Sequence, residues 1–429
     1  MFGISRTVIC FFLLSVSLVY SDGIQEQKLY SSKRLDNSNA NDLPMQNLQI
    51  MFRHGDRAPA RDVIDDSTPV IYNWPEGIGM LTSTGVDQEY DLGHWFRERY
   101  GSYIPAVYNA SDIHMRSTDL DRTVMSGQAF MAGLYNCSNA TSCPLVKYGV
   151  RWGPVPVHTI PGDGDNMFSA PYCPRLKKLK ADILKTPEAV EGLKKYQGLF
   201  DLLKSVAVNM EITWAKVPLI TDLMICMNVS SKPFPKWCTP EVYQQLKDAQ
   251  YYIWRELPRM WPEINRFEIG MFLKHYGDTL MAAIQRTPAP GEPTIGKLYA
   301  YSVHDINLEN FQAAFDYFDG EMINYAGAMV FELHGPKPPG KMEDYYLRVL
   351  YKRGWQDRQG IYIPLKGCGE KSAEQGCRLD LFMSYINNVQ LAEDEYVVRC
   401  GFTSGSIRIL PQSLYFLIFL AISLLSPEH

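Results

Sequence analysis

The sequence has no excess of positive charge. Lys and Arg number 42 and Asp and Glu number 47, which gives a formal net charge of −5 at pH 7. No overall basic field is therefore present to hold a polyanion, so nucleic acid is not an expected partner. Small anionic substrates remain possible, because a few arginines in one cleft can set the local charge whatever the total is.

Sequence motifs for nucleotides, metals and redox cofactors are also missing. The chain contains no G-x-x-x-x-G-K-[ST], no H-E-x-x-H and no dinucleotide-binding fingerprint. It has no C-x-x-C pair and no histidine at zinc-ligand spacing from a cysteine. We therefore expect neither a metal ion nor a cofactor. What is present is a globular composition, with 46% hydrophobic and 21% charged residues.

The first residues predict export from the cytosol. Arg6 precedes an apolar run over residues 8–14, and polar sequence begins only after Tyr20. This pattern predicts a secretory signal peptide over residues 1–20. A signal anchor is the alternative, but the run is short against the roughly 20 residues that a membrane-spanning helix needs. Residues 21–45 are polar and rich in Asn and Ser, and we expect them to form a mobile leader.

The last residues predict attachment to a membrane. Small residues at 403–406 and a short spacer precede an apolar run over residues 414–425. This order is typical of a GPI-anchor signal, which we expect over residues 403–429. A transmembrane tail is the alternative, but the run is short for a span and no basic cluster follows it.

The cysteines agree with an oxidising compartment. Of the nine, Cys10 would leave with the signal peptide, and the remaining eight form an even set. Close spacing suggests the local pairs Cys137–Cys143, Cys226–Cys238 and Cys368–Cys377, and it leaves Cys173 and Cys400 over. Spacing alone does not fix the connectivity.

Potential glycosylation sites point to the same compartment. Sequons begin at Asn109, Asn136, Asn139 and Asn228. We therefore expect a glycoprotein of the secretory pathway on the extracellular face of the plasma membrane. A lysosomal or a secreted protein is the alternative.

The hydrophobic pattern predicts an α/β fold. Buried strands are expected at 48–52, 113–115, 297–303, 328–334 and 345–351, with helices at 84–100 and 120–135 between them. This alternation favours one mixed, largely parallel sheet with helices on both faces. Residues 46–402 would form this domain, with an inserted helical cap at about 175–285.

Charged residues stand at the ends of three expected strands. They are Arg53-His54 with Arg57, then Arg116, and finally His304-Asp305. Ligands of open α/β sheets bind at the carboxyl ends of the strands, so these side chains should meet at one edge. Arginine guanidinium groups match phosphate oxygens with paired, charge-assisted hydrogen bonds, and the edge therefore predicts a phosphoryl site.

The motifs around these residues resemble the histidine acid phosphatase family, the branch with the prostatic and lysosomal acid phosphatases. The resemblance covers roughly residues 46 to 400 and includes, in family order, the segments Phe52 to Pro59, Leu81 to Tyr100, Arg116 to Thr123, Pro156 to Thr159 and Tyr301 to Asp305. It implies a phosphoglycerate-mutase-like α/β domain with a smaller helical domain. It also implies His54 as the nucleophile, Arg53, Arg57, Arg116 and His304 around the phosphate, and Asp305 as the proton donor.

The resemblance also bears on the disulfides. It implies that Cys173 closes onto Cys400. Vertebrate relatives carry a cysteine on the strand after the His-Asp motif, whereas residues 325–329 here contain none. A local Cys226–Cys238 bridge therefore becomes the preferred pairing in the helical cap.

The chemistry implied by the resemblance is metal-independent hydrolysis of phosphate monoesters. A neutral imidazole attacks phosphorus to give a phosphohistidine, water resolves it, and the arginines supply the charge that a metal provides elsewhere. Protonation of Asp305 favours an acid optimum. We expect small phosphomonoesters as partners, with a homodimer as a further possibility.

Two other functions remain open. An inositol-polyphosphate phosphatase on the same scaffold would need additional Lys and Arg around the cleft, and the sequence shows no such cluster. A catalytically silent surface glycoprotein would be indicated by loss of the nucleophile or a phosphate arginine, and these residues are intact.

Overall fold

The structure, a computed structural model, describes residues 40–60, 74–136, 152–162, 164–168, 173–207, 210–287, 296–317 and 319–402. The expected signal peptide, all but the last residues of the leader, and the C-terminal tail lie outside these ranges. So do Cys137, Cys143 and Asn139.

One mixed sheet organises the molecule. Its strand order is β3-β2-β4-β1-β5-β6-β7, and β8 also pairs with β6. The strands β3, β2, β4 and β1 are parallel neighbours, whereas β5 is antiparallel to β1 and β6 is antiparallel to β5. The bounds are β1 Met45–Arg53, β2 Ile113–Thr118, β3 His158–Ile160, β4 Leu298–Val303, β5 Ala328–His334, β6 Tyr346–Lys352, β7 Ile361–Tyr362 and β8 Cys377–Arg378. The carboxyl ends of β2, β4 and β1 consequently meet at one edge, and the expected mixed α/β fold is confirmed.

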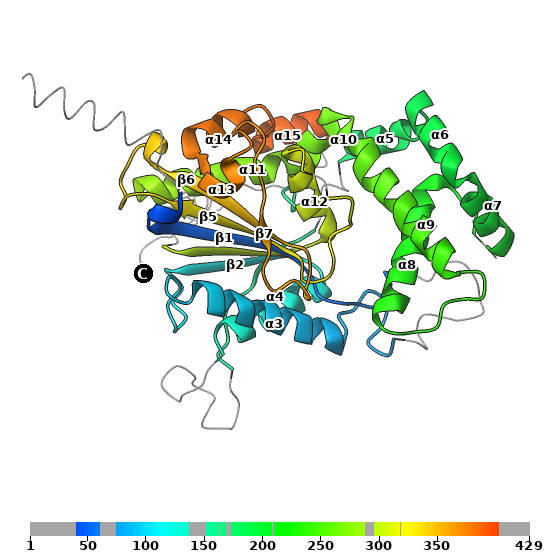
Figure 1. Ribbon diagram of the computed structural model, residues 1–429, viewed down its shortest axis with the longest axis horizontal. Helices are drawn as coiled ribbons and strands as arrows, with labels where there is room; N and C mark the ends of the chain where they lie inside the picture. The colour runs from blue at the N-terminus through cyan, green and yellow to red at the C-terminus, as the bar shows by residue number, and fades with distance from the viewer. Residues whose placement is uncertain are drawn as a thin grey trace, which may run out of the picture.

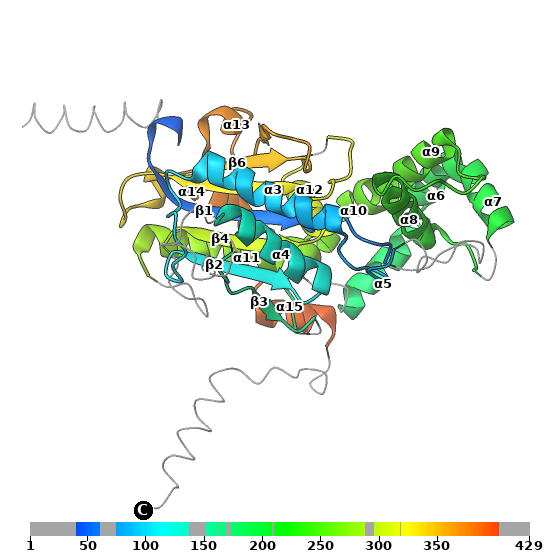
Figure 2. The same cartoon turned by 90° about the horizontal axis from the view of Figure 1, so that it is seen from below.

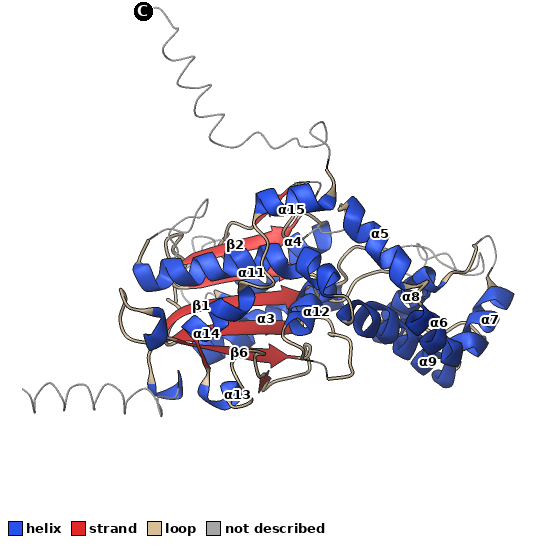
Figure 3. Cartoon of the chain, turned by 90° about the horizontal axis from the view of Figure 1, so that it is seen from above, coloured by secondary structure: helices blue, strands red, loops and turns tan. Residues whose placement is uncertain are grey.

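Both faces of the sheet are covered, because the side chains of the central strand alternate between two cores. In β1, Ile50 and Phe52 belong to one core and Met51 belongs to the other. The first core is closed by α3 (Ser83–Tyr100) and α4 (Asp121–Leu134), which lie below the sheet in Figure 1 and in front of it in Figure 2. The second is closed by α11 (Pro262–Gln285), α12 (Asp305–Ala314) and α14 (Leu379–Ile386), as Figure 3 shows from the opposite side. Each large apolar side chain buried in this way contributes about 1.5–3 kcal/mol.

The helices α3 and α4 pack closely beneath the sheet because glycines line their contact. A Cβ on Gly93 would lie 2.0 Å from the carbonyl oxygen of Phe130, and one on Gly133 would lie 2.0 Å from that of Tyr90. Any side chain at either position would push the helices apart. Nearer the start of α4, Oγ of Ser126 accepts a hydrogen bond at 3.2 Å from the backbone N–H of Gly55, which ties the helix to the end of β1 and matters for the site described below.

A helical lobe lies to one side of the sheet, at the right of Figure 1. Its elements are α5 Pro174–Ile183, α6 Pro187–Leu193, η4 Lys194–Tyr196, α7 Gln197–Val206, η5 Trp214–Lys216, α8 Val217–Val229, α9 Pro240–Tyr251, the π-helical turn η6 Tyr252–Glu256, and α10 Leu257–Arg259. Apolar residues such as Leu176, Leu203, Ile220 and Leu246 form a separate core within it.

The lobe ends earlier than the sequence indicates. The first turns of α11 contribute Ile264 and Phe267 to the core of the lobe, but Phe272, Tyr276 and Ile284 pack in the core above the sheet. The helix therefore crosses from one body to the other. Continuous helical periodicity over 175–285 cannot show this change of partner, since both cores present the same apolar surface to the helix.

The remaining elements are short and close the ends of the domain. They are η1 Ala40–Asp42, η7 Met342–Asp344, α13 Ser372–Gln375 and α15 Glu393–Cys400. A disulfide joins Cys173, which precedes α5, to Cys400 at the end of α15, and another joins Cys368 to Cys377. Both of these expected pairings are confirmed.

The expected Cys226–Cys238 disulfide is wrong, because both residues are buried free thiols. The Sγ atom of Cys226 lies 3.3 Å from the hydroxyl oxygen of Tyr325 and 3.6 Å from Nη1 of Arg57. Its side chain therefore contacts the sheet domain. The short separation of Cys226 and Cys238 in the sequence does not show which way the Cys226 side chain points.

The surface features that bear on export are few. Asn109, Asn136 and Asn228 are exposed, as glycosylation would require. Among the residues that the structure describes, no helix is long and apolar enough to cross a membrane.

Candidate active site

The chain leaves β1 through a tightly held turn. The backbone N–H of Arg53 donates to the carbonyl oxygen of Gly327, and that of His54 donates to the carbonyl oxygen of Val303 on β4. The next residue must be glycine, because a Cβ on Gly55 would lie 2.3 Å from the carbonyl oxygen of Gly85. The turn thus fixes His54 at the carboxyl edge of the sheet.

The following residues are bound to the start of α3. The backbone N–H of Asp56 donates to Oε1 of Gln88 at 2.8 Å, and Oγ1 of Thr82 donates to Oδ2 of Asp56 at 2.7 Å. Arg57 pairs with Leu81 in an isolated antiparallel bridge. The R-H-G-D-R segment is therefore rigid before any ligand binds.

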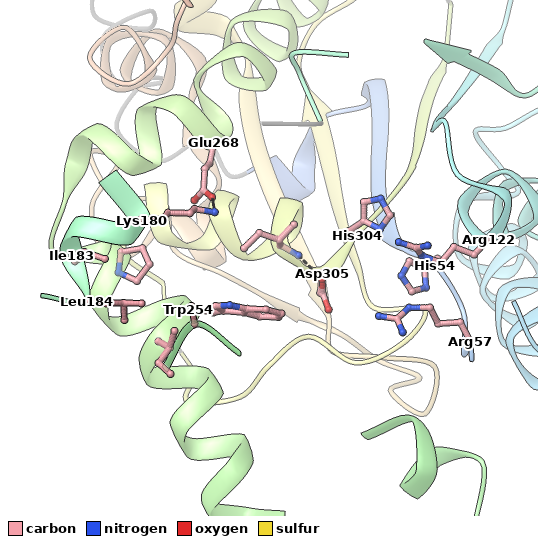
Figure 4. Close-up of a pocket in the computed structure, with 14 residues that line it drawn as sticks. His54, Arg57, Arg122, Lys180, Ile183, Leu184, Trp254, Glu268, His304 and Asp305 are labelled. Carbon is pink, nitrogen blue, oxygen red and sulfur yellow. Dashed lines mark hydrogen bonds and ion pairs between the residues drawn. The ribbon is translucent and has the colours of Figure 1, made fainter. Parts of the chain in front are cut away.

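A pocket of about 430 Å³ opens at this edge, between the sheet domain and the helical lobe. The charged and imidazole groups at its sheet end are His54, Arg57, Arg122, His304 and Asp305, which Figure 4 shows turned toward a common space. The predicted residues His54, Arg57, His304 and Asp305 are brought together here. The predicted Arg53 lies beside them, with Nη2 2.9 Å from Oδ2 of Asp305.

His54 has the tautomer that a nucleophile needs. Its Nδ1 lies 2.8 Å from the carbonyl oxygen of Gly55. A carbonyl oxygen only accepts, so Nδ1 carries the proton and Nε2 keeps its lone pair. Burial, followed by the charges of Arg122 and Arg57, holds the pKa of His54 well below its usual value. The imidazole therefore remains neutral in mildly acidic solution.

His304 is the second neutral imidazole of the pocket. It is the residue before α12, its ring centroid lies 5.4 Å from that of His54, and its Nε2 lies 3.1 Å from Oγ1 of Thr118. Burial, with a further contribution from Arg122, lowers the pKa of His304 to about 3. Two adjacent imidazoles can therefore coexist in acid without mutual repulsion.

Asp305 opens α12 and faces the same space. Its Oδ1 accepts a hydrogen bond from the backbone N–H of Ile306 at 2.8 Å. Burial raises the pKa of Asp305, but Arg53, Arg57 and His304 act in the opposite direction and the net pKa lies below the usual value. Protonation of this carboxyl is therefore favoured when a negatively charged group offsets the arginines.

The helical lobe holds one of the arginines. Nη1 and Nη2 of Arg57 lie 3.1 and 2.9 Å from Oδ2 and Oδ1 of Asp222 on α8. This bidentate pair is largely buried, with 9% and 16% of the two side chains exposed. The position of Arg57 thus depends on both bodies of the molecule.

The structure does not bring the predicted Arg116 into this pocket. Its Nη2 lies 2.7 Å from Oδ1 of Asp165, and it lines a separate depression with His275 of α11. The reason is the alternation of β2. Met115 points to the face of α3 and α4, so Arg116 points to the opposite face, before the strand reaches the edge.

Arg122 takes the place that was assigned to Arg116. It lies in the first turn of α4, shortly after the end of β2, and lines the pocket beside His304 and His54 in Figure 4. Burial and the neighbouring Arg57 lower the pKa of Arg122 to about 10, so it stays charged below neutral pH. Its place just after a strand end, inside the same R-S-T-D-L-D-R motif, was the available signal in the sequence.

A buried pair of neutral histidines surrounded by arginines defines an enzyme that handles phosphoryl groups. The chain belongs to the histidine phosphatase superfamily (branch 2), whose family model matches residues 45–352. The chain is therefore a phosphatase, and the expected family is confirmed.

Curated relatives agree with this assignment. The chain is 28% identical to human lysosomal acid phosphatase over 364 residues, covering 83% of this chain and 80% of that protein. It is also 28% identical to rat prostatic acid phosphatase over 390 residues, covering 88% and 94%.

Solved structures share the fold at low identity. The phytase from Citrobacter braakii is similar with a TM-score of 0.59 and 18% identity, over 84% of this chain and 100% of that chain. Hafnia alvei phytase in complex with tartrate gives a TM-score of 0.61 and 17% identity, over 84% and 99%.

Proposed function

We propose that this protein is an acid phosphatase of the secretory pathway, which hydrolyses phosphate monoesters through a phosphohistidine on His54. The observation that supports it is the state of His54: a buried, neutral imidazole with its lone pair on Nε2, surrounded by arginine charges. Such a group attacks phosphorus while the positive charges stabilise the equatorial oxygens.

The reaction has two steps. In the first, Nε2 of His54 forms a bond to phosphorus, the ester P–O bond breaks, and the carboxyl of Asp305 gives its proton to the departing alkoxide. In the second, the Asp305 carboxylate takes a proton from water, the oxygen of that water bonds to phosphorus, and the N–P bond breaks. Inorganic phosphate leaves, and both side chains return to their starting states.

The low pKa of Asp305 in the protein without substrate makes the first step depend on acidic solution. Arg53 and Arg57 favour its ionised form without substrate, but the charge of a bound phosphate offsets them. Acid then supplies the proton, and His54 and His304 stay neutral under the same conditions. We propose an acid optimum on this basis, with the arginines in the role that a divalent ion has in other phosphatases.

The compartment is part of the proposal. The Cys173–Cys400 and Cys368–Cys377 disulfides, the exposed sequons and the resemblance of residues 1–20 to a signal peptide support an exported glycoprotein. We propose a GPI anchor for the C-terminal residues on the sequence pattern alone. A lysosomal or secreted form remains the alternative.

His54→Ala and Asp305→Asn test the mechanism together. His54→Ala should abolish turnover of every monoester, because no phosphoenzyme can form. Asp305→Asn keeps the shape but cannot donate a proton, which is typically worth about 10²–10⁴-fold. It should therefore lose much more kcat/KM on glycerol phosphate than on nitrophenyl phosphate, whose leaving group departs readily as an anion.

Two results would contradict the mechanism. Turnover that survives in a correctly folded His54→Ala protein would remove His54 as the nucleophile. Equal losses on the two substrates in Asp305→Asn would remove Asp305 as the proton donor and leave it a residue that orients Arg53.

A further inference from the structure

The part of the pocket that extends into the helical lobe is mainly apolar. It is lined by Ile183 and Leu184 at the end of α5, by Ile253 and Trp254 of η6, and by Pro258 of α10. The charged groups of the mechanism lie at the opposite, sheet end (Figure 4). The phosphate of a monoester bound at His54 thus directs its alcohol group toward an apolar wall.

Trp254 lies where this wall meets the catalytic end. In Figure 4 its indole lies between Asp305 and the side chain of Leu184, and it is half-buried. The neighbouring Arg255 donates from Nη2 to Oε1 of Gln312 at 2.9 Å, which ties η6 to α12, the helix that begins at Asp305. The turn that carries Trp254 is therefore held against the helix that carries the proton donor. A π-helical turn interrupts regular helix geometry and is frequent at functional sites.

Positive charge is scarce in this part of the pocket. Among the described residues that line it beyond the catalytic groups, Lys180 is the one basic side chain. Its Nζ forms an ion pair with Glu268, a carboxylate that is 3% exposed. A second phosphate group on the alcohol would therefore meet apolar surface or an already paired cation, and it would lose its hydration without compensation.

We infer that the pocket selects phosphomonoesters whose alcohol carries one apolar or aromatic group, which lies over Trp254 and against Ile183 and Leu184. Alcohols that bear further phosphates are discriminated against. The volume of about 430 Å³ is in the range of small-molecule sites, roughly 300–1,000 Å³, so one such group fits beside the phosphate. This inference rests on the proposed function.

A series of n-alkyl phosphates from ethyl to octyl tests it. The reactivity of the departing alkoxide is nearly constant along this series, so changes in kcat/KM report burial of the chain and not leaving-group chemistry. We expect kcat/KM to rise about two- to fourfold per methylene until the wall is filled. myo-Inositol hexakisphosphate should be a poor substrate by the same measure.

Variants of Trp254 test whether its indole causes the dependence of kcat/KM on chain length. Trp254→Ala should lower the octyl-to-ethyl ratio of kcat/KM at least about tenfold, whereas Trp254→Phe keeps a flat apolar ring and should retain most of it. The matched control is Trp355→Ala, since Trp355 is 37% exposed and does not line the pocket.

The outcomes separate this inference from the proposed function. A flat alkyl series in the wild-type protein, or inositol hexakisphosphate as the preferred substrate, would overturn the apolar selection while turnover still depended on His54. Loss of the proposed function would appear differently, as turnover that persists in His54→Ala. If Trp254→Ala does not fold, the wild-type series decides the question alone.

Discussion

Arg116 and Arg122 belong to one short motif and have different tasks. Arg122 points into the pocket, whereas Arg116 pairs with Asp165 inside the protein. We expect Arg122→Ala to lower kcat/KM about 10²–10³-fold, as removal of a transition-state donor does. Arg116→Ala should leave Asp165 buried and unpaired and lower the free energy of unfolding by about 3–5 kcal/mol.

Kinetics and urea unfolding of both variants check this division. Arg116→Ala is the matched control for Arg122→Ala, since both remove one guanidinium from the same motif. A severe kinetic loss in a stable Arg116→Ala protein would return that residue to the phosphate site.

At this scale the sequence located most of the site. A strand ending in Arg53-His54 and another ending in His304-Asp305 predict the edge at which they meet, because parallel strands share their carboxyl ends. The side of a strand on which Arg116 lies could not be predicted in the same way. It depends on the register of β2 against β4, which no local pattern fixes.

Helix α8 reaches the active-site pocket through Asp222, which pairs with Arg57. Its bidentate contact holds Arg57 from the side of the lobe. Asp222→Asn keeps the size but removes the charge, so Arg57 should move and kcat/KM should fall about 10–100-fold, with kcat and KM both affected. Steady-state kinetics of Asp222→Asn, Asp222→Glu and the exposed control Asp248→Asn measure this effect.

The expected pattern is specific to a positioning residue. Asp222→Glu should restore part of the activity, and Asp248→Asn should match the wild type. If Asp222→Asn shows only a lower melting temperature and normal kinetics, Asp222 stabilises the lobe and does not position Arg57.

Helix α12 carries a buried acid that makes stability depend on pH. Glu309 follows Asp305 by one turn, is 0% exposed, and accepts one hydrogen bond from the backbone N–H of Ile323. Burial, opposed by Arg255, raises the pKa of Glu309 to about 7. The pKa of Glu309 is higher in the folded protein than in the unfolded chain. The stabilisation of the fold by protonated Glu309 is therefore complete below about pH 4.5 and is lost as the pH rises toward 7.

We therefore expect Glu309→Gln to reduce the loss of stability between pH 5 and pH 7. Over this interval the difference from the wild type should be about 2 kcal/mol in unfolding free energy. Denaturant titrations of both proteins at the two pH values measure it. Parallel pH dependences would show that Glu309 ionises normally in the folded protein.

Helices and strands with one clear hydrophobic periodicity could be predicted from the sequence. The packing of a helix that contacts two different cores could not. The strand expected at 297–303 appears as β4, and the helix at 84–100 appears as α3. The extent of the lobe was overestimated, since α11 packs on two different cores. The orientation of the Cys226 side chain on α8 could not be predicted from its spacing to Cys238, because neighbouring positions of a helix face different surroundings.

For the molecule as a whole, the remaining prediction concerns its place in the cell. The small residues at 403–406 and the apolar tail motivate a GPI anchor. Phosphatidylinositol-specific phospholipase C should then release the His54-dependent activity from intact cells. The matched control is a chain that ends at Phe402, which should appear in the medium without phospholipase treatment. Activity that stays on the membrane after complete digestion would exclude the lipid anchor.

The split construction of the pocket has a consequence for how this scaffold diversifies. The groups proposed to break the ester come from strand ends scattered along the chain, but the wall proposed to receive the alcohol comes from one continuous segment between Cys173 and α11. We therefore expect substrate selectivity to be transferable between related phosphatases by exchanging this one segment. Grafting the insertion of a related phosphatase should exchange the substrate range and leave the reaction intact, provided the donor carries an acid equivalent to Asp222. Substitutions of the wall residues alone should change the substrate range, whereas loss of Asp222 from the same segment should lower activity on every substrate.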